Sequence, residues 1–176
     1  VCGTVIEKQN TIAKVPATIY LTASSLKMKT GQSTTAFKAT GFSEGDYVTA
    51  ITSSKPGTVK VTNVNKNGTF KLTAGKKKGS AVVTVTLASK KTASFKVTVQ
   101  KAAVKTTKIT TSTKSLTLAK GATYKKLASS ITVTPVTSKE KVTYSSSNKK
   151  VATVSSKGVI KAKKAGTAKI TVKSGK

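Results

Sequence analysis

The stretch Phe95-Lys96-Val97-Thr98-Val99 alternates strictly between apolar and polar side chains. In an extended strand successive side chains point to opposite faces, so this pattern places one face on a core and leaves the other in water. The same alternation recurs in Val59-Lys60-Val61, Phe70-Lys71-Leu72, Val83-Thr84-Val85 and Ile170-Thr171-Val172-Lys173. No stretch shows the apolar period of an α-helix. We therefore predict an all-β protein built of antiparallel sheets with one solvated face.

Blocks of this sequence occur twice in the same order. Ser25-Leu26-Lys27-Met28-Lys29-Thr30-Gly31 returns 90 residues later as Ser115-Leu116-Thr117-Leu118-Ala119-Lys120-Gly121. We expect Leu26 and Met28, and their counterparts Leu116 and Leu118, to be core residues of an early strand. The period is too long for a solenoid repeat, so we predict two copies of one folding unit in series, each with its own core. Short strands separated by glycine-containing turns favour a sandwich or a barrel.

The duplication sets the predicted domain boundaries. We place the first domain at residues 17–99, a linker at 100–106 and the second domain at 107–176. Residues 1–16 stand outside the duplication and are a strand, a leader or the tail of a preceding domain.

The two copies end differently. The first continues into a final strand, Ala93–Val99, whereas the second reaches Ser174-Gly175-Lys176 where the equivalent strand should begin. We therefore predict that the second domain lacks its last strand, which leaves an open sheet edge. Either the natural protein continues beyond Lys176, or residues 1–16 of a neighbouring molecule add as the missing strand and link molecules head to tail.

The second copy contains an ordered set of short motifs. Val142-Thr-Tyr-Ser-Ser-Ser-Asn-Lys-Lys-Val-Ala-Thr-Val154 is followed by Gly158-Val-Ile-Lys-Ala and by Ala165-Gly-Thr-Ala-Lys-Ile-Thr-Val172. These motifs resemble the bacterial immunoglobulin-like domain, group 2, with Tyr144 where a tryptophan is common. The first copy is more divergent, with Ile51 in place of the aromatic residue. The resemblance implies tandem immunoglobulin-like β-sandwiches from an extracellular or surface protein of bacteria, with no catalytic residues.

The composition excludes most reactive chemistry. Histidine is absent and Cys2 is the only cysteine, so neither a transition-metal cluster nor a Ser-His-Asp or Cys-His arrangement can form within this chain. Glu44 and Asp46 lie in a glycine-rich turn, where two acids are typical of solvated turn residues rather than a catalytic pair. The four acids are too few to hold calcium, which some members of the family bind. We expect no enzyme, no metal and no cofactor, and no apolar run is long enough to span a membrane.

The charge of the chain is extreme and comes from lysine alone. Its 33 basic residues include no arginine, and with four acids the net charge is +29. Runs of lysine at turns are the candidate polyanion-binding residues, namely Lys76, Lys77, Lys78, Lys90, Lys91, Lys149, Lys150, Lys163 and Lys164. An anionic cell-wall or host polysaccharide suits patches repeated in both copies. The alternative is a solvated face that keeps modules apart.

Specific nucleic-acid binding is not expected, because base reading favours arginine forks and the phenylalanines and tyrosines look committed to cores. We predict a non-catalytic extracellular spacer and adhesion module of a bacterial surface protein, at the cell wall or secreted. Two alternatives remain. One is a self-assembling filament or surface-layer subunit joined by strand addition. The other is an accessory carbohydrate-binding module of a larger enzyme, which burial of all four tyrosines would argue against.

Overall fold

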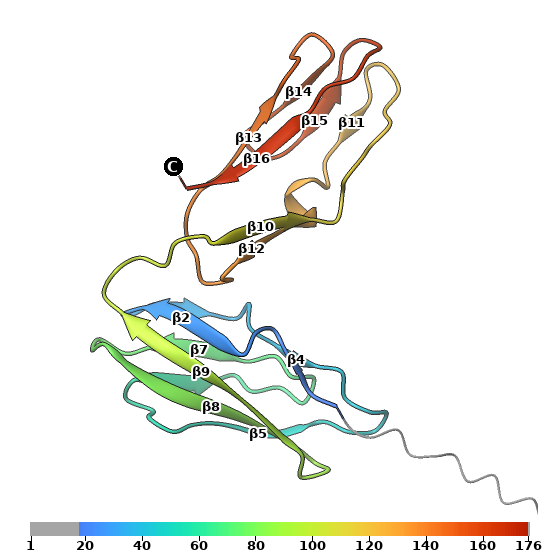
Figure 1. Cartoon of the computed structure of the whole chain (residues 1–176). Coiled ribbons are helices and arrows are strands. Elements are labelled where there is room, and N and C mark those ends of the chain that lie inside the picture. The colour runs from blue at the N-terminus through green and yellow to red at the C-terminus, as the bar shows by residue number, and fades with distance from the viewer. Residues whose placement is uncertain (1–17, 176) are drawn as a thin grey trace, which may run out of the picture.

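A computed structural model describes residues 18–175, which form two lobes built of strands (Figure 1). Strands β1 to β9 make the first lobe, and β10 to β16 make the second. The described residues contain one helical element, the short 3-10 turn η1 (Ala128–Ser130). The all-β prediction is confirmed. Residues 1–16, predicted to stand outside the repeat, lie outside the described part, and independent folding of each lobe within the boundaries given above stays a prediction.

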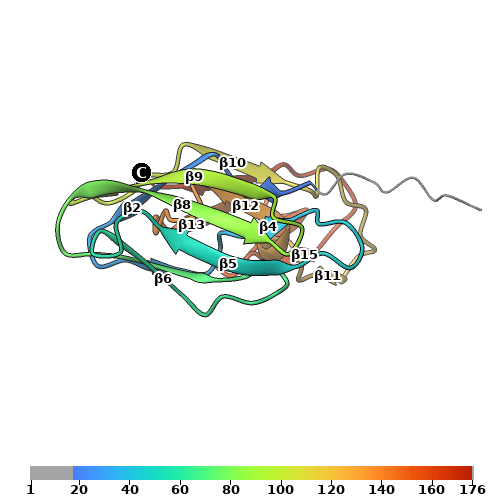
Figure 2. The same cartoon turned by 90° about the horizontal axis from the view of Figure 1, so that it is seen from below.

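The first lobe is a sandwich of two main sheets. Its larger sheet runs in the order β2 (Ser25–Lys29), β9 (Thr92–Gln100), β8 (Gly79–Leu87) and β5 (Val48–Ser53), and Figure 2 shows the last three side by side. Its smaller sheet runs β3 (Ser33–Thr34), β7 (Lys71–Ala74) and β6 (Val59–Thr62), and β1 (Tyr20–Leu21) pairs with β4 (Ala39–Thr40). Every pair is antiparallel except β2 with β9, which runs parallel and departs from the expected pattern.

The alternation in β9 builds the core of the first lobe. Phe95, Val97 and Val99 are buried, whereas Lys96 between them is exposed. The ring of Phe95 stacks on that of Phe37 with centroids 4.0 Å apart. Side chains from both sheets join this cluster, so β9 contributes to the sandwich both through its ladder and through its apolar face.

The second lobe repeats this plan with smaller sheets. Its pairs are β10 (Lys108–Thr111) with β12 (Ile131–Thr134) and β13 (Val142–Ser146) with β16 (Ile170–Ser174). Its three-stranded sheet runs β11 (Thr123–Tyr124), β15 (Ile160–Ala162) and β14 (Ala152–Val154). The register Tyr144↔Val172 repeats Ile51↔Val85 of the first lobe, so β13 and β16 correspond to β5 and β8.

The second lobe has no counterpart of β9 among the described residues, as predicted. Residues 115–119, the sequence counterpart of β2, form no strand. Leu116 is 42% exposed, whereas Leu26 is 2% exposed. The prediction that Leu116 is a core residue of an early strand is therefore wrong. In the first lobe the ladder with β9 holds β2 in place, and the described residues of the second lobe form no such ladder.

The two lobes are not collinear. Figure 1 shows the strands of the second lobe steeply inclined to those of the first, with the loop between β12 and β13 close to β2. This loop begins at the cis Thr134–Pro135 peptide, and Val136 packs against the core of the first lobe. We expected two units in series, and the structure adds a packed contact between them.

Candidate functional site

Four of the predicted lysines lie in turns at the end of the second lobe that is away from the first (Figure 1). Lys149 and Lys150 lie in the turn between β13 and β14, and Lys163 and Lys164 lie in the turn between β15 and β16. The Lys163 amide donates to the Val151 carbonyl at 2.7 Å, which holds the two turns together. The side chains of all four lysines are exposed.

Two further lysines, which the sequence analysis did not single out, lie at the same end. The amide of Gly121, next to Lys120, donates to the Ala162 carbonyl at 3.0 Å. Ser147 and Lys169 bond to each other, with the Ser147 amide 2.9 Å from the Lys169 carbonyl. Both lysine side chains are exposed. We call the six lysines at this end the basic tip: Lys120, Lys149, Lys150, Lys163, Lys164 and Lys169.

The described carboxylates lie elsewhere. Glu44 and Asp46 are in the loop between β4 and β5, where Asp46 accepts from the Ser89 hydroxyl at 2.7 Å. Glu140 lies near the junction of the lobes and accepts from the Thr106 amide at 2.7 Å. The basic tip therefore gathers like charges without an acidic neighbour among the described residues. The electrostatic field of such a surface is positive and is screened over about 8 Å at physiological salt.

The other predicted lysines occupy two different places. Lys76, Lys77 and Lys78 lie in the turn between β7 and β8, the first-lobe counterpart of the turn that holds Lys163 and Lys164. Lys90 and Lys91 lie between β8 and β9, at the opposite end of those strands. The nine predicted lysines are therefore exposed but do not form one site.

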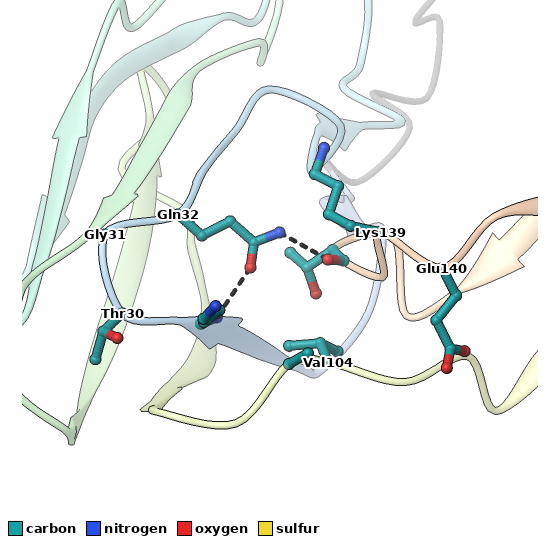
Figure 3. Close-up of a pocket in the computed structure, with 9 residues that line it drawn as sticks. Thr30, Gly31, Gln32, Val104, Lys139 and Glu140 are labelled. Carbon is teal, nitrogen blue, oxygen red and sulfur yellow. Dashed lines mark hydrogen bonds between the residues drawn. The ribbon is translucent and has the colours of Figure 1, made fainter. Parts of the chain in front are cut away.

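A polar and apolar contact joins the two lobes, and the sequence pattern did not predict it. Gln32 Nε2 donates to the Thr137 carbonyl at 2.7 Å, and Gln32 Oε1 accepts from the Lys29 amide at 2.9 Å (Figure 3). The Thr137 hydroxyl donates to the Lys27 carbonyl. Thr137 is only 1% exposed and Val104 of the linker 6%. We call this contact the joint.

The joint surrounds a cavity of about 420 Å³. Its titratable lining residues are Lys29, Lys139 and Glu140, and Figure 3 shows the Glu140 side chain pointing away from Gln32. The Glu140 carboxylate is engaged by the Thr106 amide. Within the described residues no group of three histidine, cysteine or acidic side chains could hold a metal ion. The joint thus offers packing and hydrogen bonds between the lobes.

The tyrosines are not all buried. Tyr20 is 64% exposed and Tyr47 39%, whereas Tyr124 and Tyr144 are half-buried. The expectation that all aromatic side chains belong to cores is therefore wrong for Tyr20 and Tyr47. Tyr47 carries the Lys66 ammonium 4.9 Å from its ring centroid, a cation–π distance. Burial of all four tyrosines would have argued against a carbohydrate-binding module, and because two of them are exposed that argument does not apply. In the described part, no helix has the length and apolarity needed to cross a bilayer.

Comparison with solved structures returns parts of the S-layer protein SbsC. Its domains 5–6 share 18% identity with this chain over 89% of both chains, with a TM-score of 0.43. Its domains 4 and 5 share 24% identity with a TM-score of 0.39, and the match covers 47% of this chain and 44% of that one. Likeness at these scores carries no functional argument. No curated protein matches the chain.

The family comparison gives a specific result for the second lobe. The model of the bacterial Ig-like domain (group 2) matches residues 105–176. This range begins just before β10 and includes every strand of the second lobe. The motifs between Val142 and Val172 supply β13, β14, β15 and β16. Residues 105–176 are therefore a bacterial Ig-like domain of group 2.

Proposed function

We propose that this chain is a non-catalytic extracellular module of a bacterial surface protein, which sets the spacing of its neighbours and binds anionic polymers through the basic tip. The observation that carries the proposal is the gathering of six exposed lysines from three loops at one end of the second lobe. The described carboxylates lie on other loops. A polymer with regularly spaced phosphate or carboxylate groups can contact several of these lysines at once.

Two further features support this proposal. The group 2 Ig-like domain favours a surface protein, since the family is typical of extracellular bacterial modules. The joint favours a spacer with a defined bend. Thr137 and Val104 are buried between the lobes, and a hydrogen bond from Gln32 to Thr137 connects one lobe to the other. A spacer with a fixed joint would present the basic tip in one direction.

The test compares two variants of equal charge. The tip variant carries Lys→Gln changes at Lys149, Lys150, Lys163 and Lys164. The control carries the same change at four exposed lysines within strands: Lys60, Lys96, Lys161 and Lys173. Binding is measured to teichoic acid, heparin and a neutral glycan across a salt series.

Each exposed ion pair contributes about 0.2–1 kcal/mol, so the tip variant should bind the anionic polymers about tenfold or more weakly at low salt. The control should lose less, although its net charge is the same. Equal losses would show that only net charge matters and would remove the tip from the proposal. Binding of the neutral glycan as tight as that of the two polyanions would overturn the adhesive function.

A further inference from the structure

The cavity at the joint has the size and the place of a small-molecule site. Its volume of about 420 Å³ lies within the range of roughly 300–1,000 Å³ that is usual for such sites, and interfaces between domains are a common place for them. The first lobe supplies residues 29–32, the linker supplies Ala103 and Val104, and the loop between β12 and β13 supplies three more residues. A ligand in this cavity would therefore touch both lobes at once.

The charge offered to such a ligand is positive. Lys29 comes from β2 and Lys139 from the loop between β12 and β13, and both are exposed. The one carboxylate among the lining residues is that of Glu140, which accepts from the Thr106 amide at 2.7 Å. Figure 3 shows the side chains of Lys139 and Glu140 extending in opposite directions. Because lysine carries its ammonium on a flexible stem, each of the two lysines can turn onto an anion in the cavity.

A second hollow extends the positive surface along the joint. It has a volume of about 260 Å³ and shares Lys139 with the cavity. Its other charged lining residue is Lys71 of β7, and the remaining lining residues are small and uncharged. Three lysines from the two lobes therefore lie along the joint, and their combined field favours an anionic ligand over a neutral one.

Uncharged groups complete the lining of the cavity. Val104 is 6% exposed and provides an apolar surface, and its amide makes no hydrogen bond to any described residue. A buried amide without a protein partner bonds to water or to a ligand. The Gln32 side chain is already engaged, since its Nε2 donates to the Thr137 carbonyl and its Oε1 accepts from the Lys29 amide. The lining thus offers positive charge, a hydrogen-bond donor and an apolar surface, which together suit an organic molecule with an acidic group.

We propose that the cavity at the joint binds an organic anion of the size of a monosaccharide, whose carboxylate or phosphate group bridges Lys29 and Lys139. The apolar part of the ligand packs on Val104. Because the two lysines belong to different lobes, the ligand binds the closed joint better than an open one and so favours closure. This site does not depend on the basic tip, which lies at the other end of the second lobe, so the two proposals can fail separately.

The experiment titrates the ¹⁵N-labelled full chain with glucose 6-phosphate, glucuronate and neutral glucose at physiological ionic strength. The shifts of the backbone amides locate the site and give the dissociation constant, and the same spectra show that each variant is folded. The chain is used as wild type, as Lys29→Gln, as Lys139→Gln and as the double variant. The matched control combines Lys27→Gln with Lys141→Gln, which removes the same charge two positions away from each cavity lysine. Both control side chains are exposed, and neither lines the cavity.

Two results are expected. At least one of the two anions saturates a single site with its largest shifts at residues 29–32, 103–104 and 137–140, whereas glucose does not produce these shifts. The anion that binds more tightly shows whether the site prefers a phosphate or a carboxylate. Each single variant weakens the binding about threefold or more and the double variant about tenfold or more, whereas the control leaves it within about twofold.

Several results would overturn the proposal. One is the absence of saturable shifts at the joint with both anions, or shifts centred on the basic tip instead. Another is glucose binding as tightly as the anions. Equal losses in the control and in the double variant would show that the overall charge of the chain holds the anion. A loss in only one of the single variants would assign the ligand to one lobe and remove the bridge between the two.

Discussion

Replacing Gln32 by alanine and Thr137 by valine together should release the joint. The Gln32 amide donates to the Thr137 carbonyl at 2.7 Å, and the Thr137 hydroxyl donates to the Lys27 carbonyl. Each such hydrogen bond contributes about 0.5–1.5 kcal/mol, and a buried partner left unpaired adds a further cost of about 1–3 kcal/mol. The double substitution should therefore remove about 2–4 kcal/mol of the free energy that favours the closed joint.

The contacts that remain are mainly apolar. Val136 is half-buried against the core of the first lobe, so it contributes less than the roughly 1.5–3 kcal/mol of a fully buried side chain. Since about 1.4 kcal/mol corresponds to a factor of ten, losing about 2–4 kcal/mol should raise the ratio of open to closed molecules roughly 30- to 700-fold, so the variant should open in a larger fraction than the wild type.

The assay is small-angle X-ray scattering combined with ¹⁵N relaxation. We expect the variant to show a larger radius of gyration and separate tumbling times for the two lobes, whereas the wild type tumbles as one body. Thr84→Val is the matched control, because it makes the same chemical change to a hydroxyl that bonds Ser94 inside the first lobe. A variant that scatters and tumbles like this control would refute the role of the two hydrogen bonds in holding the joint.

Two other substitution pairs test the fold by urea unfolding. Leu26→Ala should cost about 2–5 kcal/mol, because Leu26 is 2% exposed, whereas Leu116→Ala at the equivalent position should cost less than about 1 kcal/mol. Equal costs would contradict the difference in burial between the two leucines. Gly68→Ala should destabilise by about 2 kcal/mol or more, since an added Cβ would lie 2.0 Å from the Ala39 carbonyl oxygen, in addition to the strain of a positive φ. Gly31→Ala has a similar φ but open space, so it should cost only about 1–2 kcal/mol, and a larger loss than at Gly68 would contradict the packing around that turn.

Local alternation predicted much of the fold. Phe95 to Val99 lie in β9 with their apolar side chains inward, because period-two patterning is a property of the strand itself. Residues 107–176 contain no match for the sequence of β9, and among the described residues the second lobe indeed has no strand in that place. The prediction from the same alternation was wrong at Leu116, although the sequence around it resembles that of β2. Burial there depends on a partner strand, and local sequence does not record whether that partner is present.

The candidate site could be predicted only in part. Lysine runs identified Lys149, Lys150, Lys163 and Lys164, but not Lys120 and Lys169, which join them through backbone bonds between distant segments. The sequence contained no pattern that predicts the joint, because Gln32 and Thr137 are loop residues outside any apolar periodicity. Their roles come from the packing of one lobe against the other, which a single sequence does not encode in any local pattern.

The most direct test of the proposed function is to map where a polyanion binds. A ¹⁵N-labelled chain is titrated with a short heparin fragment at low and at physiological salt, and the shift of each backbone amide is followed. We predict that the largest changes fall on the turns of the basic tip, at residues 120–121, 148–151 and 163–169. Changes spread evenly over all exposed lysines, or centred on Lys90 and Lys91, would contradict a binding site at the tip.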